Sequence, residues 1–380
     1  YVLSGLHTEE FYHWACGTNQ SAGYSPHTIV AFRRWLRKRY QHPSKLQSAW
    51  QSADVHFENA TVPSMAARRA LGNGVFRDPS RQRPVIDFYQ FWNELIPDTI
   101  DYFAQVARKA THSRKVIGAF YGYLYEFAGN PEFGHNALGK LVRSKNVDFI
   151  AVTASYSHRQ AGRGCDYSRS PSTSVQLHNK VWYHDNDVVS FRAKQIMERI
   201  GFSQDADWTR NLDVQLESLG YTDTPEKSRW MYRRGLGMAL CKGFHVSWFD
   251  LHGGYFDAPE LMDEIQQLNH LATRAATANR ASMAEVLVVS DELSCAYAAP
   301  QGGLLRESLL TPQNQLTRIG AATDHILLED IELVDVDQYK LVIFLNTWHV
   351  TDRQRQAIRQ RVLKNQRYVV WCYTAGLFGE

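Results

Sequence analysis

The chain has 380 residues, of which 44% are hydrophobic and 12% aromatic, and its net charge is +3. This size and composition are typical of a soluble globular protein with a large core and more than one domain. No apolar run approaches the roughly 20 residues that a membrane helix needs, and the first residues lack signal-peptide features, so we expect no membrane partner. The compartment stays open between cytoplasm and periplasm. Charges of both signs are interspersed, and the basic run RRWLRKRY reads as a solvated helix face, so we expect no nucleic-acid partner.

The five cysteines are scattered singly, without CxxC or His-rich spacing. They therefore indicate neither a zinc site nor a disulfide framework, and we expect no metal and no cofactor. Tyr, Phe and Trp are plentiful at 19, 18 and 10 residues. Flat aromatic faces suit stacking on sugar rings, although most aromatics in any protein are core residues. Composition thus favours a carbohydrate ligand only weakly.

The chain opens with YVLSGLHTEEFYHW, an apolar strand-like run that ends in Glu9 and Glu10. Because side chains alternate faces along a strand, at most one of the two acids can face a cleft. Burial and a neighbouring negative charge both raise the pKa of a carboxyl group, which keeps a general acid protonated near neutral pH. The alternative reading is a solvated loop that carries two acids.

Helices and strands alternate after this opening. The spacing of apolar residues predicts five helices. They lie over IVAFRRWLRKRY, over residues 87–110, and around HNALGKLVRS, KSRWMYRRGLGMALCKG and APELMDEIQQLNHLATRA. The stretch between the first two helices is predicted to be irregular. The alternation predicts a parallel sheet, and polar or aromatic residues end each strand, as on the active-site face of a TIM barrel. We predict five such strands, at residues 1–6, 115–123, 147–154, 179–185 and 244–250.

The pattern of apolar residues changes from residue 284. Short apolar strands in AEVLVVSDE, YKLVIFLN and RYVVWCYTAGLF, with a helix over TDRQRQAIRQRVLKN, predict a second, doubly wound α/β domain. We therefore expect a first domain over residues 1–283 and a second over 284–380. Cys372 follows a strand, but WCYTAG lacks the Gly-x-Cys-x-Gly turn of a nucleophile elbow, so we interpret this cysteine as structural.

The order of several segments resembles clan A glycoside hydrolases, in particular a divergent group similar to the family 42 β-galactosidases. The segments are GLHTEEFYHW, FRRWLRKRYQHPSKLQSAW, GAFYGYLYE, DFIAVTASY, SVQLHNKVWYHDND and RRGLGMALCKGFHVSWFDLHGG. Residues 339–376 resemble the amidotransferase-like trimerisation domain of that family. The resemblance implies a (β/α)8 barrel in which the opening strand is the fourth. We therefore expect a partial TIM barrel in a fragment that lacks the first barrel strands, and a homotrimer by resemblance alone.

The resemblance also implies hydrolysis of β-glycosides with retention, by an acid/base Glu after the fourth strand and a nucleophilic Glu after the seventh. These positions fall on Glu10 and Asp185. Asp is one methylene shorter than Glu, which withdraws the carboxylate by about 1.5 Å. Asp187 would face the same side while the strand persists and is an alternative. Val189 and Ser190 stand where related sequences tend to carry Arg and Thr, so weakened or lost activity is the competing interpretation.

Further candidates follow from the same alignment of strand ends. Glu9, at a position where clan members often carry Asn, either tunes Glu10 or forms a salt bridge behind the strand. Trp248 is a candidate sugar-stacking floor and Asp250 a candidate acceptor for sugar hydroxyls. The predicted substrate-binding set is completed by Tyr121, Tyr123, Glu126, Tyr156, Arg159, Trp182, His184 and Asp187, although each aromatic can equally be core. We interpret His135 and His178 as structural, because a lone His usually has a structural partner.

Two functions fit the sequence. The first is a retaining β-glycosidase that acts on β-galactoside-like substrates. The second is a catalytically weakened or silent relative that still binds carbohydrate and oligomerises, an alternative motivated by the Asp at position 185.

Overall fold

The first of two parallel sheets carries the predicted barrel strands. The computed structural model describes residues 1–6, 9–14, 16, 22–157, 159–164, 168–204, 207, 210–279, 281–300 and 303–379. The first sheet has the order β1-β2-β3-β4-β5 and every neighbouring pair is parallel. Its strands are β1 (Val2–Leu3), β2 (Gly118–Phe120), β3 (Phe149–Thr153), β4 (Val181–Asn186) and β5 (His245–Trp248). All five predicted strands are confirmed, and each is shorter than the predicted range.

The register of this sheet brings the carboxyl ends of its strands to one edge. Thr153 of β3 pairs with Asp185 of β4, and Asp185 pairs with Ser247 of β5. Every residue of β3 is buried, as is usual for a parallel strand covered on both faces. The side chains after these strands therefore meet on the side of the sheet where a barrel enzyme holds its active site.

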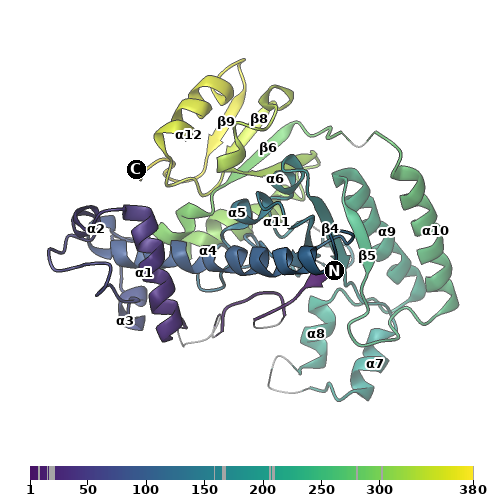
Figure 1. Ribbon diagram of the computed structural model, residues 1–380. Helices are drawn as coiled ribbons and strands as arrows, with labels where there is room; N and C mark the ends of the chain where they lie inside the picture. Colours follow the sequence, from purple (N-terminus) through teal and green to yellow (C-terminus); the bar gives the residue numbers. More distant parts are fainter. Residues whose placement is uncertain are drawn as a thin grey trace.

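Helices cover the first sheet and extend to one side of it (Figure 1). The helix α4 crosses the centre of the view, and α9 and α10 lie side by side next to β5. The prediction began α4 too late, since Asp78 caps the helix by accepting the N–H of Ser80, and Pro79 stands at the first helical position. Beside the predicted helices there are three short ones that the sequence analysis missed. The helices are α4 (Pro79–Ala110), α5 (Leu138–Val142), α6 (Ser172–Leu177), α7 (Ala193–Arg199), α8 (Leu212–Ser218), α9 (Pro225–Lys242) and α10 (Pro259–Ala275).

Three helices pack around the N-terminal end of α4. The helix α1 (Pro26–Tyr40) was predicted and is capped by Ser25. The helices α2 (Pro43–Trp50) and α3 (Met65–Arg69) lie in the stretch that was expected to be irregular, which is a correction. At 8 and 5 residues they are too short for clear periodicity. Aromatic and aliphatic side chains of α1, α2 and α4 form a core of their own, which includes Phe32, Leu36, Leu46, Phe88 and Phe91.

The second sheet has the order β7-β6-β8-β9 and is also wholly parallel. It contains β6 (Val286–Ser290), β7 (Thr323–Leu327), β8 (Leu341–Phe344) and β9 (Tyr368–Trp371), with α11 (Thr311–Leu316) and α12 (Asp352–Ala357). The sequence analysis missed β7 because Asp324 and His325 interrupt its apolar run. Both side chains are buried and hydrogen-bonded, Asp324 to the hydroxyl of Tyr339 and His325 to Gln313.

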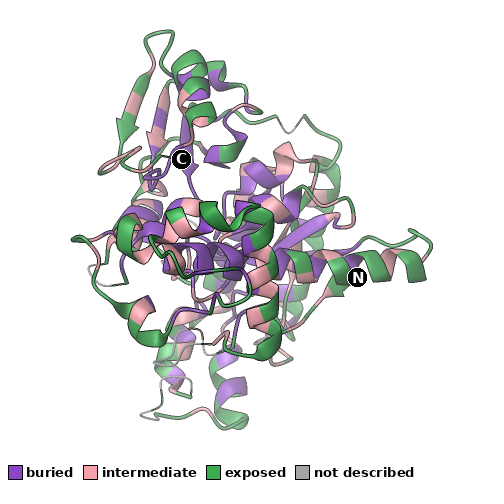
Figure 2. Ribbon diagram, turned by 60° about the vertical axis from the view of Figure 1, so that its left-hand side comes forward, coloured by how far each residue is buried: buried purple, intermediate pink, exposed green. Residues whose placement is uncertain are grey.

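The two sheets share one hydrophobic core. Residues of both, such as Ile150 and Val288, belong to the same buried cluster, and the hydroxyl groups of Tyr125 and Ser290 lie 3.0 Å apart across the junction. Figure 2 shows this buried material at the centre of the molecule, with exposed helices around it. The division near residue 283 and the amidotransferase-like character of the second part stay predictions.

Gly118 gives a test of how tightly β2 is held between its neighbours. A Cβ at this position would lie 2.4 Å from the carbonyl oxygen of Phe149 on β3. We expect Gly118→Ala to destabilise the protein by about 1–3 kcal/mol, the usual cost of overpacking, and to lower its thermal midpoint. Gly237→Ala is the matched control, because nothing lies within 4 Å of its Cβ position in the interior of α9. That variant should raise the midpoint, and equal shifts for both variants would contradict the packing of β2.

Candidate active site

Glu10 reaches the carboxyl edge of the sheet through a turn, not along a strand. The strand β1 ends at Leu3, and Glu9 and Phe11 both have φ of 63°. Gly5 and Glu10 form an isolated parallel bridge. Glu9 is exposed and Glu10 is half-buried, so the two acids do point to different environments. The reason is the local turn and not the strand alternation that the sequence analysis assumed.

Aromatic side chains surround the Glu10 carboxyl group. The Tyr12 hydroxyl donates to Glu10 Oε2 at 2.7 Å, and the Tyr12 ring lies 5.8 Å from Tyr123 and 4.7 Å from His135, centroid to centroid. Burial raises the pKa of Glu10 above its ordinary value, and the Tyr12 hydrogen bond and the Arg169 charge oppose this shift. The environment therefore favours a protonated carboxyl group more than water would.

Asp185 is the buried acid of the neighbouring strands. It lies on β4 with 4% of its surface exposed, and the hydroxyl of Ser247 on β5 donates to its Oδ1. Burial raises the pKa of Asp185 to about 6, the Ser247 hydrogen bond opposes the rise, and the charges of Asp187 and Glu10 add to it. The charge of Glu10 therefore reaches Asp185, and that of Asp187 reaches Glu10.

Asp187 differs from Asp185 in having a cationic partner. Its Oδ1 lies 2.8 Å from Arg159 Nη2, and its Oδ2 accepts the Tyr156 hydroxyl at 3.2 Å. Arg159 is fully buried, donates to the carbonyl oxygen of Ser155 and lies over the Tyr156 ring at 4.2 Å. Arg159 and Tyr156 thus hold the Asp187 carboxylate in place, and the positive charge of Arg159 compensates its negative charge. Among the described residues no Lys, Arg or His forms an ion pair with Asp185, which leaves that acid the better candidate nucleophile.

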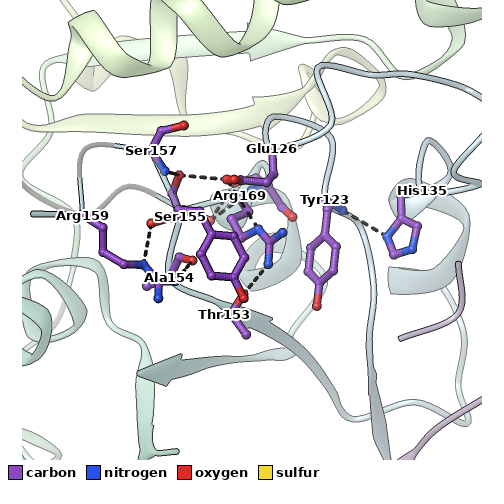
Figure 3. Close-up of polar contacts among 12 residues, drawn as sticks. Tyr123, Glu126, His135, Thr153, Ala154, Ser155, Ser157, Arg159 and Arg169 are labelled. Atoms are coloured by element: carbon purple, nitrogen blue, oxygen red, sulfur yellow. Dashed lines mark hydrogen bonds and ion pairs between the residues drawn. The ribbon is translucent and has the colours of Figure 1, made fainter. Parts of the chain in front are cut away.

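Arg169 is the central residue that sequence reasoning missed. It is buried, bonds to the hydroxyl of Thr153 and lies 3.6 Å from a carboxylate oxygen of Glu126 (Figure 3). Its guanidinium group packs over the rings of Tyr123 at 4.1 Å and Tyr156 at 5.0 Å. The sequence offers no signal for this role, since Arg169 stands in a serine-rich loop far along the chain from its partners.

Glu126 belongs to the support of the site. Besides Arg169 it binds the hydroxyl of Ser155, which donates to Glu126 Oε2 at 2.8 Å (Figure 3). Glu126 and Arg169 thus hold the loop after β3 beside the loop after β2, and Arg159 links the loop after β3 to Asp187 after β4. Of the predicted site residues, the structure thus brings together Glu10, Tyr123, Glu126, Tyr156, Arg159, Asp185 and Asp187.

Trp182 and His184 were expected to flank the acids, and the structure places them elsewhere. They alternate with Asp185 along β4, so their side chains project from the opposite face of the sheet. The Trp182 ring lies 5.3 Å from Phe244, and the buried His184 ring lies 6.4 Å from the same residue. Both residues are part of the packing between sheet and helices.

Three other candidates have hydrogen-bond partners outside the cluster of acids. The Tyr121 hydroxyl donates to the carbonyl oxygen of Gly134 at 2.9 Å. Trp248 is half-buried, its indole donates to Asn269 on α10 at 3.0 Å and its ring packs near Tyr232, and its role as a sugar-stacking floor stays a prediction. Asp250 accepts the backbone N–H of Tyr255 at 3.0 Å and so caps its own loop.

The two histidines interpreted as structural have structural partners. His135 Nδ1 accepts the backbone N–H groups of Gly122 and Tyr123, and its ring is stacked between Tyr121 and Tyr123. His178 Nε2 lies 2.8 Å from a carboxylate oxygen of Asp330. Within the described ranges, no group of three His, Cys, Asp or Glu side chains is arranged to hold a metal ion. No described helix combines the length and the apolar character needed to cross a membrane.

Comparison with known proteins supports the resemblance drawn from the sequence. The glycoside hydrolase family 42 model, described as beta-galactosidase, matches residues 5–185, which begin just before Glu10 and end at Asp185. The predicted resemblance to this family is confirmed over that range. A search of curated proteins finds no match for the chain.

Solved structures share the fold at low sequence identity. The β-galactosidase of the psychrophilic Marinomonas ef1 matches with a TM-score of 0.54 and 13% identity over 94% of this chain and 54% of its own. An exo-carrageenase of family 42 from Bacteroides ovatus matches with a TM-score of 0.58 and 10% identity over 96% and 51%. A family 42 β-galactosidase from G. stearothermophilus matches with a TM-score of 0.54 and 15% identity over 95% and 51%. These matches confirm the partial TIM barrel, and the chain spans about half the length of each of these proteins.

Proposed function

We propose that this relative of the family 42 β-galactosidases is a glycoside hydrolase, a retaining β-glycosidase for β-galactoside-like substrates, with Glu10 as acid/base and Asp185 as nucleophile. The observation that carries the proposal is that the half-buried Glu10 and the buried Asp185 lie at one edge of the sheet, where burial raises the pKa of each and the charge of Glu10 adds to the rise at Asp185. Both acids lie within the range that matches the family.

The residues around the two acids suit these roles. Glu10 protonates the glycosidic oxygen as the bond breaks, while the Asp185 carboxylate attacks the anomeric carbon to form a glycosyl-enzyme. Glu10 then takes a proton from the water that releases the sugar. The Tyr12 hydroxyl fixes the orientation of Glu10, and the Ser247 hydroxyl fixes that of Asp185. Retention requires the two carboxyl groups to be about 5–5.5 Å apart in the working complex.

Substrate contacts come from the rim of the same cluster. Tyr156 is 37% exposed, although its hydroxyl is bound to Asp187 and the guanidinium groups of Arg159 and Arg169 lie over its ring. The exposed part of this side chain is the proposed contact with a sugar. Glu9 completes the proposed binding set as a sugar contact, and Tyr123, Glu126, Arg159 and Asp187 belong to it as positioning residues. A homo-oligomer, a trimer by resemblance, is part of the proposal, and light scattering on the purified chain tests it.

The stereochemistry of hydrolysis tests the proposed reaction. The chain is incubated with an aryl β-galactoside, and the anomer that forms first is identified by ¹H NMR. The proposal predicts hydrolysis with the β-anomer appearing before mutarotation. The α-anomer as first product would exclude a retaining pair.

The pH dependence of kcat/KM follows from the raised pKa of Asp185. A nucleophile must be ionised, and since the pKa of Asp185 is about 6, activity should fall as the pH drops below that value. Ser247→Ala removes a hydrogen bond that lowers the pKa of Asp185, so the acidic limb should move to higher pH in this variant. An acidic limb near pH 4 that does not respond to Ser247→Ala would contradict the role of Asp185. The acidic limb reflects the titration of Asp185 and Glu10 together, because the charge of Glu10 also affects the pKa of Asp185.

A second candidate function rests on the residue at position 185. Aspartate in place of glutamate withdraws the carboxylate, and small displacements cost much of the rate in a positioned nucleophile. The chain would then be a carbohydrate-binding relative without turnover. Binding of galactose by calorimetry, together with no hydrolysis of any aryl β-glycoside, would favour this function.

A further inference from the structure

We infer that Arg169 is a positioning residue of the proposed reaction, and that its fixed positive charge stabilises the Glu10 carboxylate that forms when the glycosidic bond breaks. The inference rests on the proposed function, because it assigns a role in the same reaction. In the first step Glu10 gives its proton to the leaving oxygen, and the Asp185 carboxylate becomes part of an ester with the sugar. The negative charge of the site thus passes from Asp185 to Glu10. A cation beside Glu10 therefore stabilises the glycosyl-enzyme more than the complex that precedes it.

Contacts with two other segments hold Arg169 at the carboxyl edge of the first sheet. Arg169 is 2% exposed, and its Nη1 donates to the hydroxyl of Thr153 at the end of β3 (Figure 3). Thr153 pairs in the sheet with Asp185 on β4. The carbonyl oxygen of Arg169 accepts the backbone N–H of Tyr125, in the loop after β2, at 3.0 Å. Both the side chain and the backbone of Arg169 are therefore held in place beside the acids.

Two tyrosines connect Arg169 with Glu10. The guanidinium group of Arg169 packs over the Tyr123 ring at 4.1 Å, and the Tyr123 ring lies 5.8 Å from the Tyr12 ring, centroid to centroid. The Tyr12 hydroxyl donates to Glu10 Oε2 at 2.7 Å. Burial raises the pKa of Glu10, and the Tyr12 hydrogen bond and the charge of Arg169 oppose this rise. The charge of Arg169 therefore acts on the ionisation of Glu10.

The pairing of charges in the site leaves part of the Arg169 charge available to Glu10. Asp187 compensates the charge of Arg159, whose Nη2 lies 2.8 Å from it. Arg169 Nε lies 3.6 Å from a carboxylate oxygen of Glu126 and makes no hydrogen bond within the described part of the chain. An ion pair without a hydrogen bond is weaker than one that has it, so Glu126 compensates Arg169 only in part.

Other groups also face Glu10 and affect its ionisation. The Asp187 carboxylate raises the pKa of Glu10, whereas Arg169 is the cation with the largest effect on it. Burial lowers the pKa of His135 far below its ordinary value, so this ring adds no positive charge near neutral pH. The titratable groups around Glu10, apart from Arg169, are Tyr12, Tyr123, His135, Tyr156, Asp185 and Asp187.

The pH dependence and the leaving-group dependence of hydrolysis test this role. Arg169→Gln should raise the pKa of Glu10, so Glu10 stays protonated to higher pH and the basic limb of kcat/KM should move up by about one unit. The loss of kcat/KM should be larger for alkyl β-galactosides than for 2,4-dinitrophenyl β-galactoside, whose leaving group needs no proton. Arg169→Lys keeps the charge and should retain the wild-type basic limb.

Two further variants separate the charge of Arg169 from structural support. Arg77→Gln is the matched control, because Arg77 is also 2% exposed and packs over a tyrosine ring, that of Tyr89 at 4.9 Å, outside the site. It should lower the thermal midpoint without moving the basic limb. Glu126→Gln removes the partner charge of Arg169 and can still accept the Ser155 hydroxyl. It should move the basic limb to lower pH, and it tests the inference even if Arg169→Gln does not fold.

A titration without substrate distinguishes failure of this inference from failure of the proposed function. The ionisation of Glu10 is followed by ¹³C NMR of the chain labelled in its glutamate carboxyl groups, with Glu10→Gln to assign the signal. Hydrolysis by the wild type, with an unmoved basic limb and an unmoved Glu10 titration in Arg169→Gln and Glu126→Gln, would overturn the role of Arg169 alone. A wild type without turnover would overturn the proposed function, and opposite shifts of the Glu10 titration in the two variants would still support control of its charge by Arg169.

Discussion

Glu10→Gln is expected to reduce turnover of alkyl β-galactosides by about 10²- to 10⁴-fold, the usual contribution of a general acid. Glutamine has the same shape and can still accept the Tyr12 hydroxyl, but it cannot protonate a leaving group. The site holds Glu10 with a raised pKa, so a neutral amide should fit without loss of packing. The thermal midpoint should therefore stay near that of the wild type. Steady-state kinetics and thermal unfolding of the same preparation give both values.

The neighbouring acid is the control for this result. Glu9 has the same charge and lies one residue away, but it is exposed. Glu9→Gln should therefore leave kcat within a few-fold of the wild type, and the loss of its proposed contact with the sugar should change KM instead. Unchanged turnover in Glu10→Gln would remove Glu10 from the reaction, and an equal loss in Glu9→Gln would show that the variants act through the turn and not through proton transfer.

Substitution of Asp185 should have the other large effect. Asp185→Asn keeps the shape of the side chain and its contact with Ser247 but removes the nucleophile, so turnover should fall at least 10³-fold. Asp185→Glu separates the two proposed functions, because it restores the length that related sequences have at this position. In a working Asp185 enzyme the longer side chain should be displaced and turnover should fall.

The opposite response of Asp185→Glu would identify a silent relative. If the wild-type chain binds saccharide without turnover, the added methylene should create or raise activity. Asp187→Asn is the comparison for both variants, since Asp187 is held by Arg159 and Tyr156. It should lower stability as well as turnover, because it removes the buried ion pair between Asp187 and Arg159. A fall in turnover without loss of stability would place Asp187 in the reaction instead.

Much of the first sheet could be predicted from the sequence. Each of its strands is an apolar run followed by polar or aromatic residues, and the helices α1, α9 and α10 carry periodic apolar positions. The strand β7 could not be found in this way, because Asp324 and His325 become acceptable in a strand only through partners on other segments. The short helices α2, α3, α6, α7 and α8 depend on packing more than on periodicity.

The candidate site was predictable only in part. Position in the family pattern gave Glu10 and Asp185, but Arg169 and Ser247 act through contacts between distant segments that no local pattern shows. The faces on which Trp182 and His184 lie also follow from the sequence. The strand alternation that puts Asp187 on the side of Asp185 puts these two residues on the other side. The position of Trp248 depends on its hydrogen bond to Asn269 on α10, so the sequence of β5 alone could not predict it.

The most direct test of the central claim is to identify the residue that becomes attached to the sugar. The chain is treated with a 2-deoxy-2-fluoro-β-galactosyl fluoride, which slows the release of a glycosyl-enzyme, and the labelled peptide is sequenced by mass spectrometry. The account predicts a single glycosyl adduct on Asp185 and none in Asp185→Asn. An adduct on another carboxylate, or hydrolysis of β-galactosides with no adduct at all, would contradict it.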